Sequence, residues 1–579
     1  MKQANFFGLI LTFPLLIASC STEVAPSKSN TASSTQSSSG VSISSSERSE
    51  STSSALSSQQ DITSIEESVF SEDKTSEEAI TSEEVITSEE GLLSSAEESK
   101  SQKPDGPKSF TFYSVNDFHG AIKEGDTSSG YYKAGVAKYF GELAERKQSD
   151  PEHTVLLSAG DMWQGSLESN NSQGLFVTEA MSAAGFDAMA MGNHEFDFGI
   201  ENIKSNAEVA SFPFLGGNIM NFEDGWFTQT RNELFDISKV IERDGIKIGI
   251  IGMIGAGLTT SITSRNVASL WFDDPIPHAI AEATRLKEEE NTSINVLIVH
   301  ADASSVTELF NFEKEDGSTL DMYFDVVFCA HSHRMNNECV DGVPMLQAYS
   351  KGEAYSKATI TINEGEVIER SGSIEFVDSL YSTNENVNDV VDKYMTDELI
   401  ALGNRQAGFI SGYIDKRGVG ALGCKAIFER YKDQYPDLAC AMMNSQREGL
   451  SGTVTYSDIF EATPFANNIV IANIKGSDII SEAVYNPTYT GDIFRFGTID
   501  ADKYYTCAVI DYLFYHTNVT KQYDYFKGNR PGGGNEVVAE YVTHPYELIY
   551  DYFKTAEENT IDPITLSGRE NGFDLYYGS

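Results

Sequence analysis

The chain has 579 residues, and its 87 acidic against 41 basic side chains give a formal net charge of −46. So acidic a protein lacks the basic surface that long nucleic acids require, which excludes that class of partner. The length is sufficient for two folded domains and a tail.

The first twenty residues have the pattern of a secretion signal. Lys2 supplies a positive charge, and residues 6–18 form an apolar core that is too short to span a membrane. The segment Ile17-Ala18-Ser19-Cys20 fits a bacterial lipobox. We therefore expect cleavage before Cys20 and attachment of lipid to that residue, at the extracellular face of the bacterial cell membrane. The alternative is an ordinary cleaved signal peptide with an incidental cysteine.

Residues 21–108 are rich in Ser, Thr and Glu and contain few aromatic residues. A hexapeptide repeat begins at Thr75, Thr81 and Thr87. Such a composition cannot bury enough apolar surface to offset the entropy of ordering the chain. We expect a disordered tether that lifts the folded part off the membrane, with a weak transient helix at the repeat as the alternative.

Five short segments between residues 109 and 330 have the composition of buried strands. They are rich in apolar or β-branched residues and cover 109–115, 154–159, 186–191, 294–299 and 325–330. A further segment of this kind covers 246–253. The stretches between them are long enough for crossover helices, so we predict a layered α/β domain.

Each of the five segments is followed, within a few residues, by residue types that bind metal ions. The set comprises Asp117, His119, Asp161, Asn193, His300, His331 and His333. The carboxyl ends of strands lie side by side in an open α/β sheet, so these residues can meet at one point. For any one histidine, a structural hydrogen-bonding role is the alternative.

The ligand types predict the chemistry of this site. Nitrogen and oxygen donors without a thiolate suit a pair of divalent ions such as Zn or Mn better than one structural zinc. Asp161 stands alone at the end of its segment and is the natural bridge between two ions. Two such ions can hold and ionise a shared water and support its in-line attack at phosphorus. We therefore expect hydrolysis of a phosphate ester.

The order of these motifs resembles the calcineurin-like metallophosphoesterase superfamily. The matching pieces are Asp117-Phe118-His119, Gly160-Asp161, Gly192-Asn193-His194-Glu195, His300 and His331-Ser332-His333. The segment from Gly192 to Gly199 is similar to the 5′-nucleotidase and UDP-sugar hydrolase branch in particular. One departure is Ala330, where the family usually has glycine.

The resemblance implies a four-layer α/β/β/α domain over residues 109–378 and a role for each matching residue. The first metal would be held by Asp117, His119, Asp161 and His333. The second would be held by Asp161, Asn193, His300 and His331. His194 would donate to the phosphoryl oxygens, with Asp197 orienting its imidazole. Water would then be the nucleophile, without a phosphoenzyme.

A second domain is expected after a polar boundary near residue 378. A helical pattern over 387–402 predicts a linker helix within 379–402, and residues 403–579 are enough for a smaller α/β domain with its own core. Residues 452–460 and 463–468 resemble the 5′-nucleotidase C-terminal domain, which in the family closes over the metal site and supplies substrate-recognition residues.

On this resemblance, Phe465 would form one face of an aromatic clamp around a nucleotide base. Tyr512 occupies the position of the second face, although the family's glycines are missing here and Asn518 stands where an Asp is expected. Phe514 and Tyr515 are alternatives for that face, and all of these rings could instead be core residues.

The phosphate-binding loop of the family is also altered. Asn444 matches it, but Arg447 lies two positions earlier than the family's arginine and would need another loop path to reach phosphate. Lys416 and Arg417 precede a segment before which the family has a basic residue, with a solvated surface pair as the alternative.

These observations together predict an extracellular phosphohydrolase that acts on nucleotides, as a monomer or a weak dimer. The alternatives within enzymes are a 2′,3′-cyclic nucleotide, a nucleotide sugar or an ester without a base as the substrate. The alternative of another class is a surface-binding lipoprotein that keeps the fold as a scaffold, which the presence of His194 and Asp197 disfavours.

Overall fold

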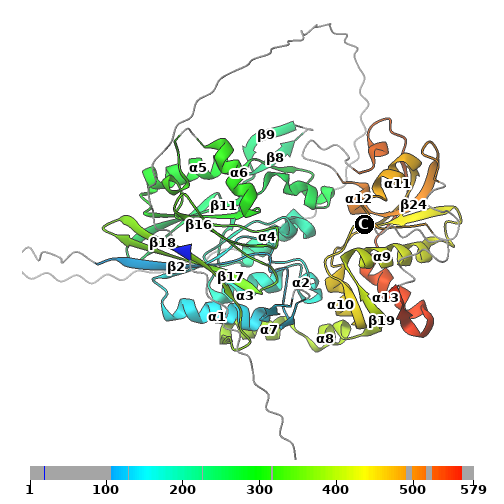
Figure 1. Cartoon of the computed structure of the whole chain (residues 1–579), viewed down its shortest axis with the longest axis horizontal. Coiled ribbons are helices and arrows are strands. Elements are labelled where there is room, and N and C mark those ends of the chain that lie inside the picture. Colours follow the sequence, from blue (N-terminus) through cyan, green and yellow to red (C-terminus); the bar gives the residue numbers. More distant parts are fainter. Residues whose placement is uncertain are drawn as a thin grey trace, which may run out of the picture. The chain divides into compact units, whose positions relative to one another are not determined.

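The computed structural model describes residues 106–127, 130–223, 226–314, 317–490, 499–516 and 525–563, together with the backbone of Ala18 and Ser19 (Figure 1). The predicted lipidation site Cys20, the tether up to residue 105 and Asn518 lie outside the described residues. Within the described part of the chain, no helix is both long and apolar enough to cross a membrane.

A seven-stranded sheet carries the first of the predicted ligand segments. Its order is β1 (Ala18–Ser19), β18 (Glu366–Phe376), β17 (Ala354–Asn363), β2 (Lys108–Val115), β5 (Thr154–Ser158), β6 (Ala188–Ala190) and β7 (Phe214–Leu215). The strands from β2 to β7 are parallel, whereas β17 pairs antiparallel with both β2 and β18. Strand β2 begins one residue before the predicted segment, at Lys108.

A six-stranded sheet carries the remaining ligand segments. Its order is β10 (Ser238–Arg243), β11 (Ile246–Ile254), β13 (Ile294–His300), β14 (Val326–Phe328), β16 (Val343–Ala348) and β15 (Met335–Val340). The four inner strands are parallel and the two edge strands are antiparallel to their neighbours. Because both faces of the inner strands are buried, their sequences are nearly continuous apolar runs.

The two sheets pack face to face. Alternate side chains of a strand point to opposite faces, so each sheet directs one set of side chains toward the other sheet. Phe112 and Leu157 of the first sheet and Ile250 and Val296 of the second belong to one fully buried cluster. The outer faces are covered by helices α1 (Gly135–Ser149), α3 (Leu175–Ala184) and α7 (Glu385–Tyr394) on one side, and by α5 (Pro275–Arg285) and α6 (Ala303–Glu313) on the other (Figure 1). The predicted four-layer α/β/β/α arrangement is confirmed.

Shorter elements connect these layers. They are α2 (Leu167–Asn171), α4 (Ile200–Val209), the short helices η1 (His194–Phe198), η2 (Ala256–Ser261) and η3 (Ser264–Val267), a small sheet of β12 (Leu270–Phe272), β8 (Ile219–Glu223) and β9 (Trp226–Arg231), and the pair β3 (Gly125–Asp126) and β4 (Tyr132–Lys133).

Three predicted elements differ from the structure by more than one residue. The segment 387–402, predicted as one linker helix, contains most of α7 and of α8 (Asp397–Gly403), which are separate helices. Thr396 causes the break, because its side chain caps α8 by accepting from the backbone N–H of Leu399. The strands predicted over 186–191 and 325–330 are each only three residues long, β6 and β14.

The second half of the chain contains two further sheets. One has the order β23 (Thr488–Tyr489), β20 (Leu438–Met442), β24 (Tyr504–Ile510), β22 (Ile469–Lys475) and β25 (Glu536–Tyr541), and the other the order β21 (Leu450–Thr455), β19 (Gln406–Ile414) and β26 (Thr560–Ile561). The main helices are α9 (Lys416–Tyr431), α10 (Tyr456–Ala462), α11 (Gly476–Glu482), α12 (Asp511–Phe514) and α13 (Pro545–Thr555).

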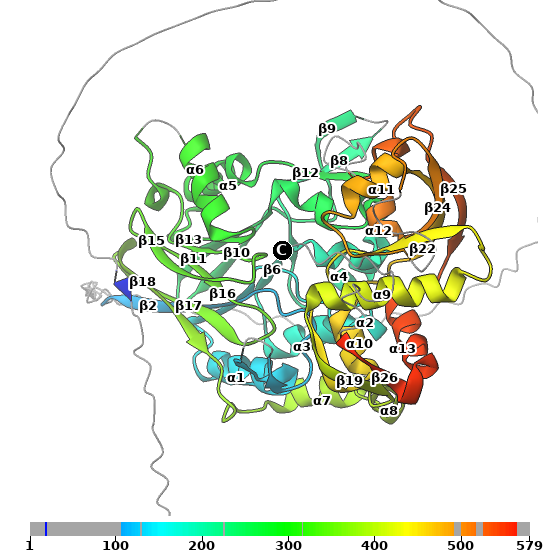
Figure 2. The same ribbon diagram turned by 45° about the vertical axis from the view of Figure 1, so that its right-hand side comes forward.

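Helix α9 lies between strands of both sheets and against α13 (Figure 2). Its Val419, Leu422 and Ile427 are fully buried in a core that also includes Val470 and Val509. These residues give the second half of the chain a hydrophobic core of its own.

Candidate metal centre and substrate cavity

The predicted ligands lie directly after the strands that deliver them. Asp117 follows β2, Asp161 follows β5, Asn193 follows β6, and His300 is the last residue of β13. His331 and His333 follow β14. The carboxyl ends of parallel strands from both sheets thus supply one site.

One group of side chains that could hold a metal ion consists of Asp117, His119 and His333, whose ligand atoms lie within 4.8 Å of one another. The Nε2 atoms of His119 and His333 are 2.9 Å apart, and Nε2 of His333 is 3.5 Å from Oδ1 of Asp117. Ring nitrogens and a carboxylate oxygen that converge in this way form a suitable cation site.

A second group consists of Asp161, His300 and His331. Asn193 joins it, because its Oδ1 is 3.0 Å from Nδ1 of His331 and 3.2 Å from Nε2 of His300. Oδ2 of Asp161 lies 3.3 Å from Nε2 of His300 and 3.8 Å from Nε2 of His119 in the first group. Asp161 therefore lies between the two groups.

Backbone carbonyls orient two of these imidazoles. Nδ1 of His119 is 3.0 Å from the carbonyl oxygen of Gln164, and Nδ1 of His300 is 2.8 Å from that of Ala159. A carbonyl can only accept, so Nδ1 of each ring carries a proton and Nε2 points into the site. Both rings are held in the orientation that a metal ligand needs.

Five of the seven predicted ligands have left-handed backbone conformations. The φ angles are 48° for Asp117, 51° for His119, 58° for Asp161, 76° for His331 and 56° for His333. Residues with side chains adopt this region at an energetic cost, and they do so most often at functional sites. Ala330, which stands at the family's glycine position, does not have a positive φ.

The electrostatics of the site favour neutral imidazoles at two ligands. Burial lowers the pKa of His119 well below its usual range, and burial together with His300 lowers the pKa of His331 to about 4. Although burial opposes it, Asp161 raises the pKa of His300 to about 9. A divalent cation would displace the proton from His300, since metal binding and protonation compete for the same nitrogen.

Glu195 holds the two ligand loops together and had no role in the sequence prediction. Its carboxylate accepts from the backbone N–H groups of Asp161, Met162 and Gly192, at 2.9, 2.7 and 2.8 Å. A Cβ atom at Gly192 would lie only 2.3 Å from Asp161. The glycine and the glutamate of the Gly-Asn-His-Glu motif therefore serve the packing of the metal site.

His194 and Asp197 form a pair next to the metal groups. Nδ1 of His194 is 2.7 Å from Oδ2 of Asp197, and the backbone N–H of His194 donates to Oδ1 of Asp161 at 2.8 Å. Asn266 steadies the same turn by donating to the carbonyl oxygens of Phe196 and Asp197. The Nε2 atom of His194 faces the guanidinium of Arg447, 3.1 Å away.

Arg447 reaches the site despite its altered position in the sequence. Its guanidinium carbon lies 5.3 Å from the ring centroid of Phe465, which is itself 6.0 Å from the ring of His194. The Nη1 atom of Arg447 is buried without a hydrogen-bond partner among the described residues. A buried, unpaired guanidinium donor next to His194 is well placed to receive an anion.

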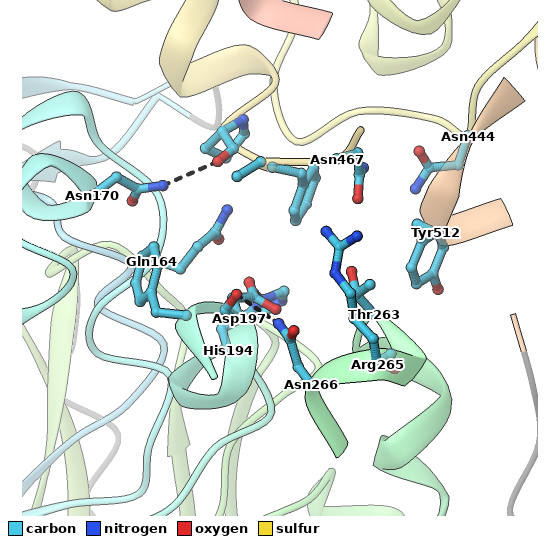
Figure 3. A pocket seen from close by; sticks show the side chains of 15 residues that line it. Gln164, Asn170, His194, Asp197, Thr263, Arg265, Asn266, Asn444, Asn467 and Tyr512 are labelled. Carbon is cyan, nitrogen blue, oxygen red and sulfur yellow. Dashed lines mark hydrogen bonds and ion pairs between the residues drawn. The ribbon is translucent and has the colours of Figure 1, made fainter. Parts of the chain in front are cut away.

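A cavity of about 190 Å³ opens beside His194 and is lined by residues from both halves of the chain (Figure 3). The predicted Asn444, Phe465 and Tyr512 are among them. Asn467, from the segment 463–468 that resembles the family, also lines the cavity, together with residues that no sequence motif indicated: Gln164, Asn170, Thr263, Arg265 and Asn266. The side-chain amide of Gln164 is buried without a partner among the described residues.

The other predicted recognition residues have different positions. Lys416 lines a second, neighbouring cavity together with Arg447, whereas Arg417 lines neither of the two. Phe514 is buried in the core of the second half, which removes it as an alternative to Tyr512. Tyr515 also packs against this core, and its carbonyl oxygen accepts from Ser264.

Three further contacts join the Tyr512 segment to the loop of η2 and η3. The Tyr512 hydroxyl donates to the carbonyl oxygen of Thr260 at 3.1 Å, and Arg265 forms an ion pair of 2.7 Å with the buried Asp511. His516 also contacts the Thr260 oxygen, at 2.9 Å. The ring of Tyr512 is thus held in the cavity wall by residues of the other half of the chain.

Two family models match the chain in the order of its halves. Residues 110–335 match the calcineurin-like phosphoesterase model, and residues 408–482 match the 5′-nucleotidase C-terminal domain. Endonuclease YhcR of Bacillus subtilis is 25% identical over 78% of this chain, which spans only 41% of that relative's length. The 5′-nucleotidase of Bos taurus is 24% identical over 64% of this chain and 71% of its own.

Among solved structures, a 5′-nucleotidase precursor from Thermus thermophilus has a TM-score of 0.62 at 18% identity, covering 79% of this chain and 99% of that one. The fold and the ligand groups thus agree with the two matched models, calcineurin-like phosphoesterase over residues 110–335 and 5′-nucleotidase C-terminal domain over residues 408–482. More particularly, the chain is similar to 5′-nucleotidases such as that of Bos taurus.

Replacing Asp161 with Asn will test the shared carboxylate. We expect calorimetric titration of the metal-free protein with Mn²⁺ or Zn²⁺ to give two binding events. Asp161→Asn should weaken both by about 100-fold, because replacing a direct ligand should reduce metal affinity at least as much as replacing a residue that supports a ligand. The matched control is Asp437→Asn, at an exposed position of the second half. Loss of one event alone would contradict sharing.

Replacing Tyr512 with Phe removes only the hydroxyl that contacts Thr260. Loss of one hydrogen bond costs about 0.5–1.5 kcal/mol, so we expect KM for a nucleotide to rise about 2- to 10-fold with little change in kcat. Tyr485→Phe, at an exposed tyrosine, is the matched control. An unchanged KM would mean that the ring does not need this contact.

Proposed function

We propose that the protein is an extracellular phosphohydrolase that uses two divalent metal ions to release phosphate from nucleotides. The observation that carries this proposal is the position of the His194–Asp197 pair, which lies between the shared ligand Asp161 and a cavity containing Phe465 and Tyr512. A scaffold that only binds would need the ligands but not a paired imidazole.

The residues present fit two divalent ions. Asp117, His119 and His333 would hold one ion, and Asn193, His300 and His331 the other, with Asp161 between them. The donors are nitrogen and oxygen atoms, which suit Zn²⁺ or Mn²⁺. When bound, such ions polarise phosphoryl oxygens and lower the pKa of water.

The chain's own side chains supply the remaining charge stabilisation. Asp197 accepts from Nδ1 of His194 and orients the ring, and Nε2 would donate to a phosphoryl oxygen once the Arg447 guanidinium, which faces Nε2, has turned to the phosphate. Arg447 directs one guanidinium nitrogen at the same place and has a second one that is unpaired among the described residues. Both groups would bind the oxygens on which negative charge develops.

The first cavity supports a nucleoside as the leaving group. Phe465 and Tyr512 offer aromatic surfaces, and a base that stacks on such rings gains about 1–3 kcal/mol largely regardless of its identity. The amides of Gln164 and Asn467 line the cavity and could meet the polar edges of the base and the sugar, whereas the side-chain oxygen of Asn444 already accepts from Gln446. We infer that the substrate is a nucleotide rather than an ester without a base.

We expect the purified protein to release phosphate from AMP in the presence of Mn²⁺ or Zn²⁺, and His194→Ala to lower kcat by about 100- to 1000-fold. The panel should also include ATP, UDP-glucose, a 2′,3′-cyclic nucleotide and an aryl phosphate. His278→Ala, where the histidine pairs with Asp273 at the surface, is the control. Full activity of His194→Ala would exclude the assigned role, and turnover of the aryl phosphate alone would exclude the nucleoside cavity.

We also propose that Cys20 carries the lipid that anchors the protein, as the lipobox predicts. We expect the protein made in a bacterial host to partition into the detergent phase, and Cys20→Ser to move it to the aqueous phase. Recovery of both proteins from the aqueous phase would favour an ordinary secretion signal.

A further inference from the structure

A second cavity adjoins the metal site. It has a volume of about 450 Å³, which is large enough for a nucleoside-sized group. Its lining includes the metal-ligand candidate His333, and it shares Phe465 with the first cavity. The described site therefore has two cavities, one beside His194 and one beside His333.

Phe465 and Arg447 separate the two cavities. Phe465 lines both, and Arg447, whose guanidinium lies over that ring, lines the second. The Nη1 atom of Arg447, buried and unpaired among the described residues, belongs to this dividing wall. A phosphorus atom bound between the metal groups could therefore direct one substituent into each cavity.

The wall of the second cavity is built directly onto the metal site. The backbone N–H of Lys351 donates to the carbonyl oxygen of Asp117 at 2.7 Å, and Asn116 donates to the carbonyl oxygen of Tyr349 at 2.8 Å. Tyr349 and Lys351 have left-handed φ angles of 44° and 55°, as several ligands do. The loop has strained backbone conformations and is hydrogen-bonded to a candidate metal ligand. We therefore interpret this cavity wall as part of the functional site.

The side chains in this cavity match the parts of a nucleotide. Tyr349 offers an aromatic ring, which packs against Tyr131 at 5.1 Å and Phe376 at 5.7 Å between ring centroids. Hydroxyl groups suited to a sugar come from Thr127, Ser350 and Ser445. Positive charges suited to a phosphate come from Lys416 and from Lys351, which also pairs with Glu448.

We propose that the second cavity binds a second nucleotide unit, so that the site also cleaves short linear phosphodiesters with one nucleoside in each cavity. This inference rests on the proposed phosphohydrolase function. Water adds to phosphorus, the P–O bond to one nucleoside breaks and its oxygen takes up a proton, which leaves one nucleotide and one nucleoside. The acidic surface restricts the substrate to a few units, because a longer chain would need a basic path.

The test compares two diesters of AMP that differ only in the second group. In the methyl ester of AMP that group is too small to reach Tyr349, whereas in the dinucleoside phosphate ApA it is a nucleoside. We expect kcat/KM for ApA to exceed that for the methyl ester about tenfold, through stacking in the second cavity. Chromatography of the products reports cleavage of the internal bond.

Variants then test whether the higher kcat/KM for ApA arises in the second cavity. We expect Tyr349→Ala to reduce the ratio of the two kcat/KM values to about one, and Tyr349→Phe, which keeps the ring, to preserve it. Lys416→Ala should remove any further gain from a terminal phosphate on the second nucleoside, whereas Lys432→Ala, a control at the other end of α9, should not.

The outcomes separate this inference from the proposed function. Hydrolysis of AMP without preference for ApA over the methyl ester would overturn the second nucleotide unit and leave the phosphohydrolase intact. A preference for ApA that Tyr349→Ala does not change would also overturn it, because the second nucleoside would then bind elsewhere. Failure to hydrolyse AMP or any other ester would instead overturn the proposed function.

Discussion

The carboxylate of Asp161 contacts three separate parts of the site. Its Oδ2 atom lies between His119 of one ligand group and His300 of the other, and its Oδ1 atom accepts from the backbone of His194. The backbone N–H of Asp161 in turn donates to Glu195. The spacing of the two ligand groups and the position of the candidate catalytic imidazole are thus fixed by one side chain.

The parts of this site that could be predicted are those in which sequence neighbours act together. A buried strand and the ligand that follows it lie within a few residues of each other, so apolar runs ending in Asp, Asn or His indicate both at once. The same holds for His194 and Asp197, which share one helical turn. The layered fold followed from the same runs, because long connections between them favour parallel strands.

The parts that could not be predicted depend on contacts between distant segments. Arg265 reaches the first cavity from η3 and pairs with Asp511 in the second half of the chain. Arg447 was in the wrong register for the family's loop, yet its position beside Phe465 brings it to His194. No local pattern indicates either contact. The break between α7 and α8 was missed for a different reason, since capping at the start of α8 outweighed a continuous helical pattern.

The left-handed backbone at five predicted ligand positions makes the stability of the fold depend on the metal ions around the protein. Each such residue costs on the order of 1 kcal/mol or more, so the ligand loops are held against their own conformational preference. Ions that bind only the folded protein offset this cost. The stabilisation that they provide rises with the logarithm of their concentration. The lifetime of the folded protein would therefore depend on the free concentration of such ions around it, and a competitor that sequesters them would destabilise the fold.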